Sequence, residues 1–167
     1  MRRYDTPAGS VALRLETPDD DAFLFALFAG HAGRPLRLAG LGDEQIETLL
    51  GLQYRAQSQT HRASFPGAVY SIIEEDGMPV GRLIEQDEGK TVYFVDFAFL
   101  PERQAKGLGT ALIEMIADEW GLKDRAARVE VRNGNAHSLK LCANLGFAVT
   151  APDRGGYIEL TRAVRRR

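Results

Sequence analysis

Residues 104–110 combine a polar side chain, a lysine and two glycines in a pattern that suits the binding of a bulky anion. The segment reads Gln-Ala-Lys-Gly-Leu-Gly-Thr and lies between an apolar run, residues 92–100, and an amphipathic run, residues 111–120. It is therefore predicted to join a strand to a helix. A helix start carries unpaired N–H groups and partial positive charge, and glycines without Cβ let an anion approach the main chain. The segment predicts a pyrophosphate site, although a glycine pair is also ordinary turn chemistry.

Two familiar phosphate loops do not fit this segment. A Walker loop ends in Gly-Lys-Ser/Thr, whereas Gly109 is followed directly by Thr110. The dinucleotide fingerprint needs a third glycine, and Leu112 stands in that place. A nucleotide phosphotransferase is therefore disfavoured, and the pattern that remains is Gln-x-x-Gly-x-Gly after a strand.

A second motif, residues 135–147, follows about thirty residues later and reads Asn-Ala-His-Ser-Leu-Lys-Leu-Cys-Ala-Asn-Leu-Gly-Phe. Alone it is typical of an amphipathic helix closed by a glycine C-cap. The two motifs in this order resemble the GNAT acetyltransferases. That family carries Gln/Arg-x-x-Gly-x-Gly/Ala and, downstream, an Asn followed by Leu-Tyr-x-x-x-Gly-Phe. The resemblance covers nearly the whole chain.

The resemblance implies that acetyl-CoA is the acyl donor and enters a gap between two strands of the sheet. The main-chain groups of Phe99 and Leu100 would pair with the pantetheine arm, and the Phe99 N–H would polarise the thioester carbonyl. Asn135 would contact the same arm. The pyrophosphate would be held by Gln104, Ala105, Lys106, Gly107, Leu108, Gly109 and Thr110.

The implied reaction is N-acetyl transfer to a primary amine by direct attack, without an acyl-enzyme. A non-catalytic acyl-CoA-binding sensor or regulatory module is the alternative. It stays open because Cys142 stands where the family commonly has a tyrosine acid. Cys142 has three interpretations: a small buried helix residue, a substitute acid, or a covalent nucleophile.

The general base is predicted from acidic residues near the implied thioester. Asp96 lies inside an apolar run, where a carboxylate needs a partner or a function. It is either the base or amine anchor, or one half of a salt bridge to Arg82 or Arg128. Glu85, near the end of the preceding strand, is the second candidate base. A bulge near Phe97 would break strict alternation and change the face on which Asp96 lies.

The acceptor site is implied to lie among the N-terminal helices and the last strands, residues 22–64 and 150–160. Gln53 and Gln57 are one helical turn apart and would share a face there.

Hydrophobic periodicity predicts the elements that must position these residues. Strands are predicted over residues 10–16, 68–75, 78–86, 91–100, 127–132, 147–151 and 156–162. Helices are predicted over 17–30, 44–63, 107–121 and 136–145, with an irregular loop over 31–42. The resemblance implies an α/β (α+β) fold of the GNAT type: a single central mixed, mostly antiparallel sheet, splayed between the fourth and fifth strands and flanked by helices. We expect one domain over residues 1–167, with a frayed tail over 163–167.

Composition excludes several other classes of protein. The 167 residues carry a net charge of −2, which gives no case for binding nucleic acid. No apolar run reaches the roughly 18 residues needed to span a membrane. The single Cys142 excludes an internal disulfide, and three scattered histidines predict no metal site. A cytoplasmic enzyme without a metal is expected, and a homodimer is left open.

Overall fold

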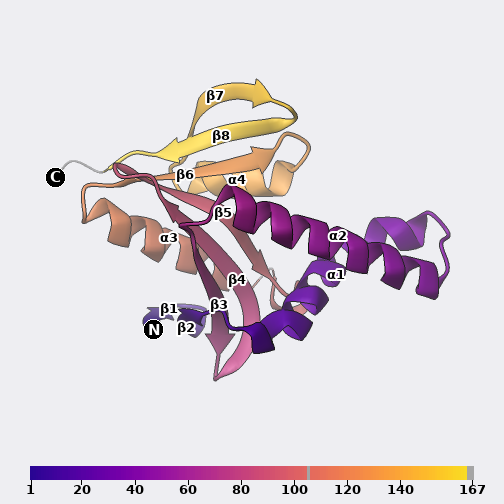
Figure 1. Ribbon diagram of the computed structural model, residues 1–167. Coiled ribbons are helices and arrows are strands. Elements are labelled where there is room, and N and C mark those ends of the chain that lie inside the picture. The colour runs from indigo at the N-terminus through magenta and orange to yellow at the C-terminus, as the bar shows by residue number, and fades with distance from the viewer. Residues whose placement is uncertain (105, 165–167) are drawn as a thin grey trace.

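The computed structural model describes residues 1–104 and 106–164, which form one eight-stranded sheet with helices on both faces (Figure 1). The strand order is β1-β2-β3-β4-β5-β6-β8-β7. The strands are β1 (Arg2–Thr6), β2 (Gly9–Leu15), β3 (Val69–Glu75), β4 (Met78–Asp87), β5 (Thr91–Phe99), β6 (Ala126–Arg132), β7 (Ala148–Arg154) and β8 (Tyr157–Arg162). The helices are α1 (Asp21–Leu38), α2 (Asp43–Ser64), α3 (Leu108–Gly121) and α4 (Ala136–Asn144), with short 3-10 turns at Pro18–Asp20 and Pro101–Arg103.

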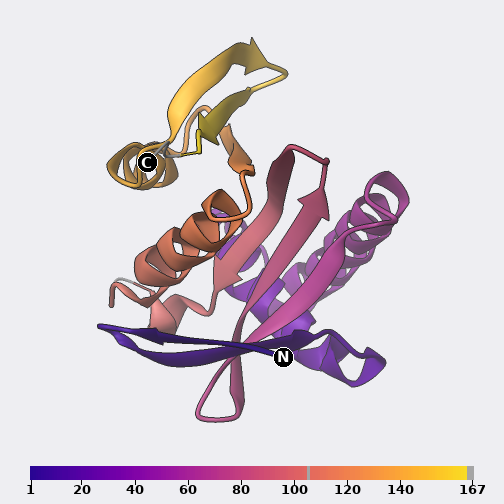
Figure 2. The ribbon, with the colours of Figure 1, turned by 90° about the vertical axis from the view of Figure 1, so that its left-hand side faces the viewer.

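The helices divide into two layers, one on each face of the sheet (Figure 2). Helices α3 and α4 cover the face that holds the larger core, in which Leu83, Phe99 and Leu112 are buried. Helices α1 and α2 cover the other face, where Leu24 and Tyr54 pack on Ile72 of β3. The mixed, mostly antiparallel sheet flanked by helices confirms the predicted fold class.

The sheet splays between β5 and β6, as the resemblance implied. These strands run parallel, unlike every other pair, and their pairing extends only from Thr91 and Ala126 to Phe94 and Val129. A β-bulge lies beside the point of separation: Ile84 pairs with Asp96 and Glu85 with Phe94, so Val95 is the extra residue. A bulge bends and twists its strand, which aims the second half of β5 away from β6. It lies two residues before the expected position at Phe97.

The predicted loop over residues 31–42 is wrong, because α1 continues to Leu38. A Cβ at Gly30 would lie 3.1 Å from the Pro101 ring, so this glycine permits close packing and does not end the helix. Pro35 lacks an N–H and so gives up one intrahelical bond, yet α1 extends past it. The chain leaves the helix at Gly40, whose φ of +78° is readily adopted only by glycine.

Two further strands differ from the prediction. β1 was missed, since three of its five residues are charged and Tyr4 is its single buried residue, so it shows no alternating apolar pattern. β7 extends to Arg154, beyond the predicted end at residue 151, through irregular pairing with β8. The other elements agree with their predicted bounds to within one or two residues. The predicted frayed tail falls largely outside the described residues. Within residues 1–104 and 106–164, no helix is long and apolar enough to cross a membrane.

A buried ionic corner fixes the start of α1 against the sheet. Asp20, 5% exposed, accepts hydrogen bonds from the Thr17 N–H at 2.8 Å and from Arg14 Nη1 and Nη2 at 2.7 and 2.6 Å. Arg14 also donates through Nε to Glu74 of β3. Chiefly through the bonds from Arg14, the pKa of Asp20 falls from 3.8 to about 2. The Arg14 guanidinium of β2 therefore joins the start of α1, through Asp20, to β3, through Glu74.

Asp20→Asn is expected to lower the free energy of unfolding by about 2 kcal/mol near neutral pH, because it replaces charge-assisted hydrogen bonds by weaker ones. A depressed pKa stabilises the fold above the unfolded value of 3.8, and that contribution is lost as pH falls toward 2. The difference between variant and wild type should therefore shrink below about pH 4 in urea titrations. Asp19→Asn, at an exposed neighbour on the same turn, is the control. An Asp20→Asn deficit that is constant with pH would contradict the assignment.

Candidate active site

The glycine segment forms the N-terminus of α3. Gly107 caps this helix with a φ of +79°, and the Ala111 N–H makes a 3.0 Å bond to the Gly107 carbonyl. The N–H groups of Leu108, Gly109 and Thr110 therefore precede the first intrahelical donor and have no partner within the helix. Three main-chain donors and the positive end of the helix dipole converge on one spot, as the sequence predicted. Ala105 lies outside the described residues.

The two glycines serve different purposes. Gly107 supplies the positive φ, and a Cβ there would meet only Ala8, at 3.9 Å. A Cβ on Gly109 would lie 3.2 Å from Cε2 and 3.4 Å from Cδ2 of Phe99. Gly109 thus makes room for a core ring, a reason that the sequence pattern did not reveal.

The second half of β5 turns an unpaired edge toward the splay. The Leu100 N–H donates to the Val80 carbonyl at 2.9 Å, so its main chain faces β4. Main-chain groups of successive residues point to opposite sides of a strand, so those of Phe97 and Phe99 face the edge that β6 has left. The prediction that Leu100 pairs with pantetheine is not supported, because its N–H is already used. Phe97, which was not among the site residues predicted from the sequence, has its main-chain groups on this open edge.

The Phe99 carbonyl is already hydrogen-bonded from two side chains. His31 Nε2 lies 2.8 Å from this oxygen and Gln104 Nε2 lies 3.2 Å from it. His31 belongs to the part of α1 that was predicted to be a loop. The contact therefore links α1 to the open edge of β5 and to the start of the glycine segment.

A cleft of about 260 Å³ occupies the splay between β5, β6 and α4, and we call it the splay cleft. Its lining brings together three residues selected from the sequence, Asp96, Asn135 and Cys142, with Phe97. The Asn135 side chain caps α4 by accepting a 3.1 Å hydrogen bond from the Ser138 N–H. Burial raises the pKa of the Cys142 thiol, so it is protonated near neutral pH.

Glu85, the second candidate base, lies on the opposite face of the sheet from Asp96, the first candidate. It is 4% exposed, accepts a 2.9 Å hydrogen bond from Trp120 Nε1 of α3, and forms an ion pair with Arg2 of β1. The structure thus places it in a network beneath α3 and away from the splay cleft, which does not favour its predicted role as a base. The bulge at Val95 is the physical reason, because it breaks the alternation between Glu85 and Asp96.

Asp96 is one half of a salt bridge, and its partner is Arg82. Arg82 Nε donates to Asp96 Oδ2 at 2.9 Å, and Nη2 of the same guanidinium forms a second bond to this oxygen. Arg128, the other partner considered, instead binds Glu88 and stacks over the Tyr93 ring. Oδ1 of Asp96 is not engaged by Arg82.

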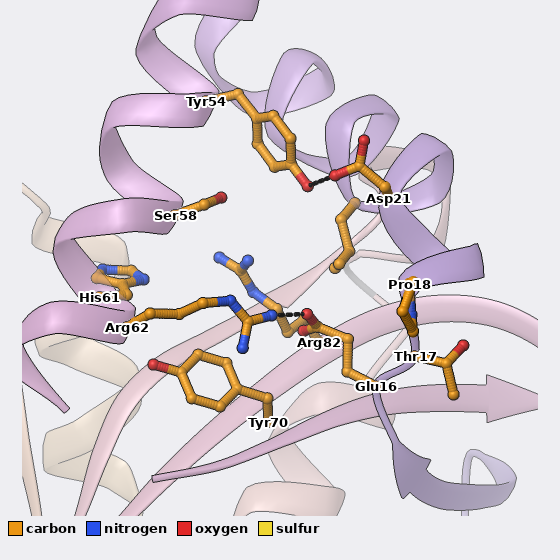
Figure 3. A pocket seen from close by; sticks show the side chains of 11 residues that line it. Glu16, Thr17, Pro18, Asp21, Tyr54, Ser58, His61, Arg62, Tyr70 and Arg82 are labelled. Carbon is orange, nitrogen blue, oxygen red and sulfur yellow. Dashed lines mark hydrogen bonds and ion pairs between the residues drawn. The ribbon is translucent and has the colours of Figure 1, made fainter. Parts of the chain in front are cut away.

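A second cavity, of about 370 Å³, lies between the sheet, α1 and α2, and we call it the helix-side cavity (Figure 3). Tyr54, Ser58 and His61 of α2 line it, and their i, i+4, i+7 spacing puts them on one helix face. Gln53 and Gln57, predicted to share a face there, are exposed and do not belong to its lining. The sequence could have indicated this cavity through Tyr54, because Ser58 and His61 follow on the same face of the helix as this buried residue.

His61 is the residue of this cavity that sequence reasoning missed. Its Nδ1 is buried and has no hydrogen-bond partner within the described residues. Burial lowers the pKa of His61 below 6.5, so the imidazole is neutral near pH 7. Asp96 and Arg82 are its nearby charges.

The Arg82–Asp96 pair forms the boundary between the two cavities. Arg82 lines the helix-side cavity, whereas Asp96 lines the splay cleft. A molecule in one cavity and a molecule in the other would therefore meet at this ion pair. Among residues 1–104 and 106–164, no group of three or more His, Cys, Asp or Glu side chains is arranged to hold a metal ion.

Comparison with known proteins gives one family and many structural matches. Residues 39–147 match the acetyltransferase (GNAT) family. The PaiA N-acetyltransferase of Thermoplasma acidophilum, solved with coenzyme A, has 16% identity and a TM-score of 0.65 over 92% of this chain and 98% of its own. The ribosomal-protein-S18-alanine N-acetyltransferase of Escherichia coli has 18% identity and a TM-score of 0.61 over 94% and 96%. An acetyltransferase of Bacillus subtilis, also with CoA, has 16% identity and a TM-score of 0.62 over 92% and 97%.

These structural likenesses show a shared fold. A comparison with curated proteins finds no significant match.

Gly107→Ala is expected to weaken CoA binding about tenfold, or by about 1.4 kcal/mol, because Cβ disfavours the left-handed turn that aims the α3 N–H groups. Gly89→Ala is the matched control. Gly89 has a φ of +81° in open space at a distant hairpin, so its backbone cost is similar. Isothermal titration of both variants with CoA checks the prediction, and equal dissociation constants would contradict it.

Proposed function

This chain belongs to the acetyltransferase (GNAT) family, and on that premise we propose that it transfers the acetyl group of acetyl-CoA to a primary amine by direct attack. The observation that carries the proposal is the meeting of two cavities at the Arg82–Asp96 pair. One cavity suits the thioester arm of the donor and the other suits a compact acceptor.

The donor would occupy the splay cleft and the N-terminus of α3. The pantetheine arm carries amides, and the open edge of β5 offers the main-chain N–H and carbonyl of Phe97 and the N–H of Phe99 to pair with them. Asn135 lies in the same lining. The pyrophosphate would accept hydrogen bonds from the N–H groups of Leu108, Gly109 and Thr110, with Lys106 exposed beside them.

The acceptor would enter the helix-side cavity and approach the thioester at the boundary between the cavities. Oδ1 of Asp96 would accept a hydrogen bond from the amine there, while Oδ2 accepts hydrogen bonds from Arg82. The carboxylate favours the charged ammonium form of the bound amine and the Arg82 guanidinium opposes it, so the unprotonated fraction of the bound amine is the form that attacks. His61, neutral and with a buried Nδ1 that lacks a partner, would accept the proton that the amine loses.

In the proposed reaction the amine nitrogen bonds to the acetyl carbon and the carbon–sulfur bond breaks. The Phe97 N–H would polarise the thioester carbonyl, the role first predicted for Phe99. Cys142, a protonated thiol in the cleft lining, is the proposed proton donor to the departing sulfur. A covalent role for Cys142 is disfavoured, because a nucleophile needs a lowered pKa and that of Cys142 is raised.

A non-catalytic acyl-CoA-binding module is the second candidate. The observation in its favour is the cysteine at position 142, where the family commonly has a tyrosine. The organised acceptor side, with the Arg82–Asp96 pair and His61, favours the enzyme instead.

A cytoplasmic location, a single domain over residues 1–167 and a homodimer stay predictions from the sequence and the family resemblance.

Release of free CoA from acetyl-CoA across a panel of primary amines tests the proposed function. We expect amine-dependent release for at least one class of amine, together with an N-acetylated product found by mass spectrometry. Asp96→Asn should lower kcat/KM by about tenfold or more, because it weakens the anchor and leaves Arg82 without its counterion. Tight CoA binding without turnover of any amine would support the non-catalytic module.

The acid limb of the pH–rate profile is expected to report His61. Because burial lowers the pKa of His61, protonation removes the proton acceptor only below about pH 6.5, and kcat/KM should fall there. His61→Gln should lower kcat/KM about tenfold or more and abolish this limb. His137→Gln, at an exposed histidine of α4, should keep the wild-type profile. A His61→Gln variant with an unchanged profile would refute the assignment.

A further inference from the structure

The helix-side cavity extends across the sheet, away from the boundary with the splay cleft. Glu16, Tyr70, Ile84 and Asp96 lie in one row, because the Glu16 N–H donates to the Tyr70 carbonyl, Tyr70 pairs with Ile84, and Ile84 pairs with Asp96. At about 4.8 Å between strands, the main chains of Glu16 and Asp96 are roughly 14 Å apart. The cavity therefore has a near end at Asp96 and a far end at Glu16.

The far end carries two carboxylates, the buried Glu16 and the exposed Asp21, and one oxygen of Glu16 lacks a partner among the described residues. The Glu16 side chain is 8% exposed, and its Oε2 is buried without a hydrogen-bond partner among the described residues. Asp21 accepts a 2.7 Å hydrogen bond from the Tyr54 hydroxyl, and no basic side chain in the described part of the chain pairs with it. Figure 3 shows Asp21 and His61 on opposite sides of the cavity, with Glu16 below them and paired with Arg62.

The basic side chains of the cavity do not satisfy these oxygens. Arg82 is paired with Asp96 at the near end. Arg62 pairs with Glu16 through Oε1, yet its side chain is 58% exposed, so water screens its charge more than that of the buried carboxylate. The N-terminus of α1 offsets part of the Asp21 charge and leaves Glu16 Oε2 without a donor.

The charges around the cavity leave one positive charge missing. Glu16, Asp21, Arg62 and Arg82 line the cavity, and Arg82 is already neutralised by Asp96 of the splay cleft. This leaves the two carboxylates of Glu16 and Asp21 with one guanidinium, that of Arg62, while the lowered pKa of His61 keeps it neutral near pH 7. The reacting amine cannot supply the missing charge, because it must be unprotonated when it attacks. A cation elsewhere on the acceptor can supply it.

We propose that the acceptor is an extended aliphatic amine with a second cationic group, and that Glu16 and Asp21 hold this second cation while the first nitrogen reacts at the Asp96 end. The inference rests on the proposed function and names its substrate class. Leu24 and the rings of Tyr54 and Tyr70 line the cavity between its ends, which suits a methylene chain.

Matched amines of one chain length test the proposal. Cadaverine carries a second ammonium, aminopentanol a neutral hydroxyl, and pentylamine neither. We expect kcat/KM for cadaverine to exceed that for pentylamine by about tenfold or more, with aminopentanol close to pentylamine. Equal rates for cadaverine and pentylamine, or for cadaverine and aminopentanol, would overturn the second-cation assignment.

Two variants locate the second cation. Glu16→Gln keeps an oxygen for Arg62 and removes the charge, and Asp21→Asn keeps an oxygen for the Tyr54 hydroxyl. Each should bring the ratio of cadaverine to pentylamine to within about threefold of one. Asp19→Asn removes the same charge from an exposed neighbour outside the cavity lining and should keep the ratio. A wild-type ratio of kcat/KM for cadaverine to that for pentylamine in both cavity variants would refute the site. If Glu16→Gln fails to fold, the ratio in Asp21→Asn alone tests the site.

A binding measurement separates this inference from the proposed function. Dissociation constants of cadaverine and pentylamine for the CoA-saturated protein are measured by calorimetry, without acetyl transfer. Tighter binding of cadaverine by about tenfold, lost in Glu16→Gln, would support the inference even if no amine were acetylated. Turnover of pentylamine and cadaverine alike, with equal binding, would leave the acetyltransferase function intact and overturn the inference.

Discussion

The interruption of pairing between β5 and β6 is the constraint on which the rest of the structure depends. Main-chain N–H and C=O groups need partners, and a sheet normally supplies them strand by strand. Here the ladder ends after Phe94 and Val129, and the bulge at Val95 turns β5 away, so the sheet carries an open edge in its interior. Helix α4 flanks the gap and α3 begins at one end of it. An extended molecule with amides can complete the ladder, and a protein without the splay would have no place for one.

The Arg82–Asp96 pair is the second organising element, because it is shared by both sides of the site. Its side chains are 11% and 26% exposed, so loss of either partner would leave a charge in a poorly solvated position. One partner lines the helix-side cavity and the other lines the splay cleft. In the proposed function, the reaction at this boundary would take place beside a fixed pair of opposite charges, which also links β4 to β5 near the bulge.

The sequence could predict the parts of this site that depend on local signals. The glycine segment, the strand before it and the helix after it are contiguous, so Gly107 at the start of α3 follows from the order of residues. The sequence predictions were wrong where contacts between residues far apart in the chain determine the local structure. Gly30 was predicted to end the helix, but it allows Pro101 to pack against α1. Glu85 was predicted as an alternative to Asp96 for the base, but one extra residue, Val95, puts the two on opposite faces of the sheet. His61 gave no motif, and its role depends on the cavity that α1, α2 and the sheet form together.

The close approach of Gly109 to Phe99 limits which residue pairs can occupy these two positions during sequence divergence. The two positions share one small volume, since a methyl group on residue 109 would lie 3.2 Å from the ring. They do not vary independently, because a side chain at 109 requires the ring at 99 to shift by a few tenths of an ångström or to be replaced by a smaller residue. The family pattern of the loop permits alanine at the second glycine, and this geometry states the condition under which it does so. Positions 99 and 109 should therefore covary among related chains, with glycine retained wherever an aromatic ring occupies the strand.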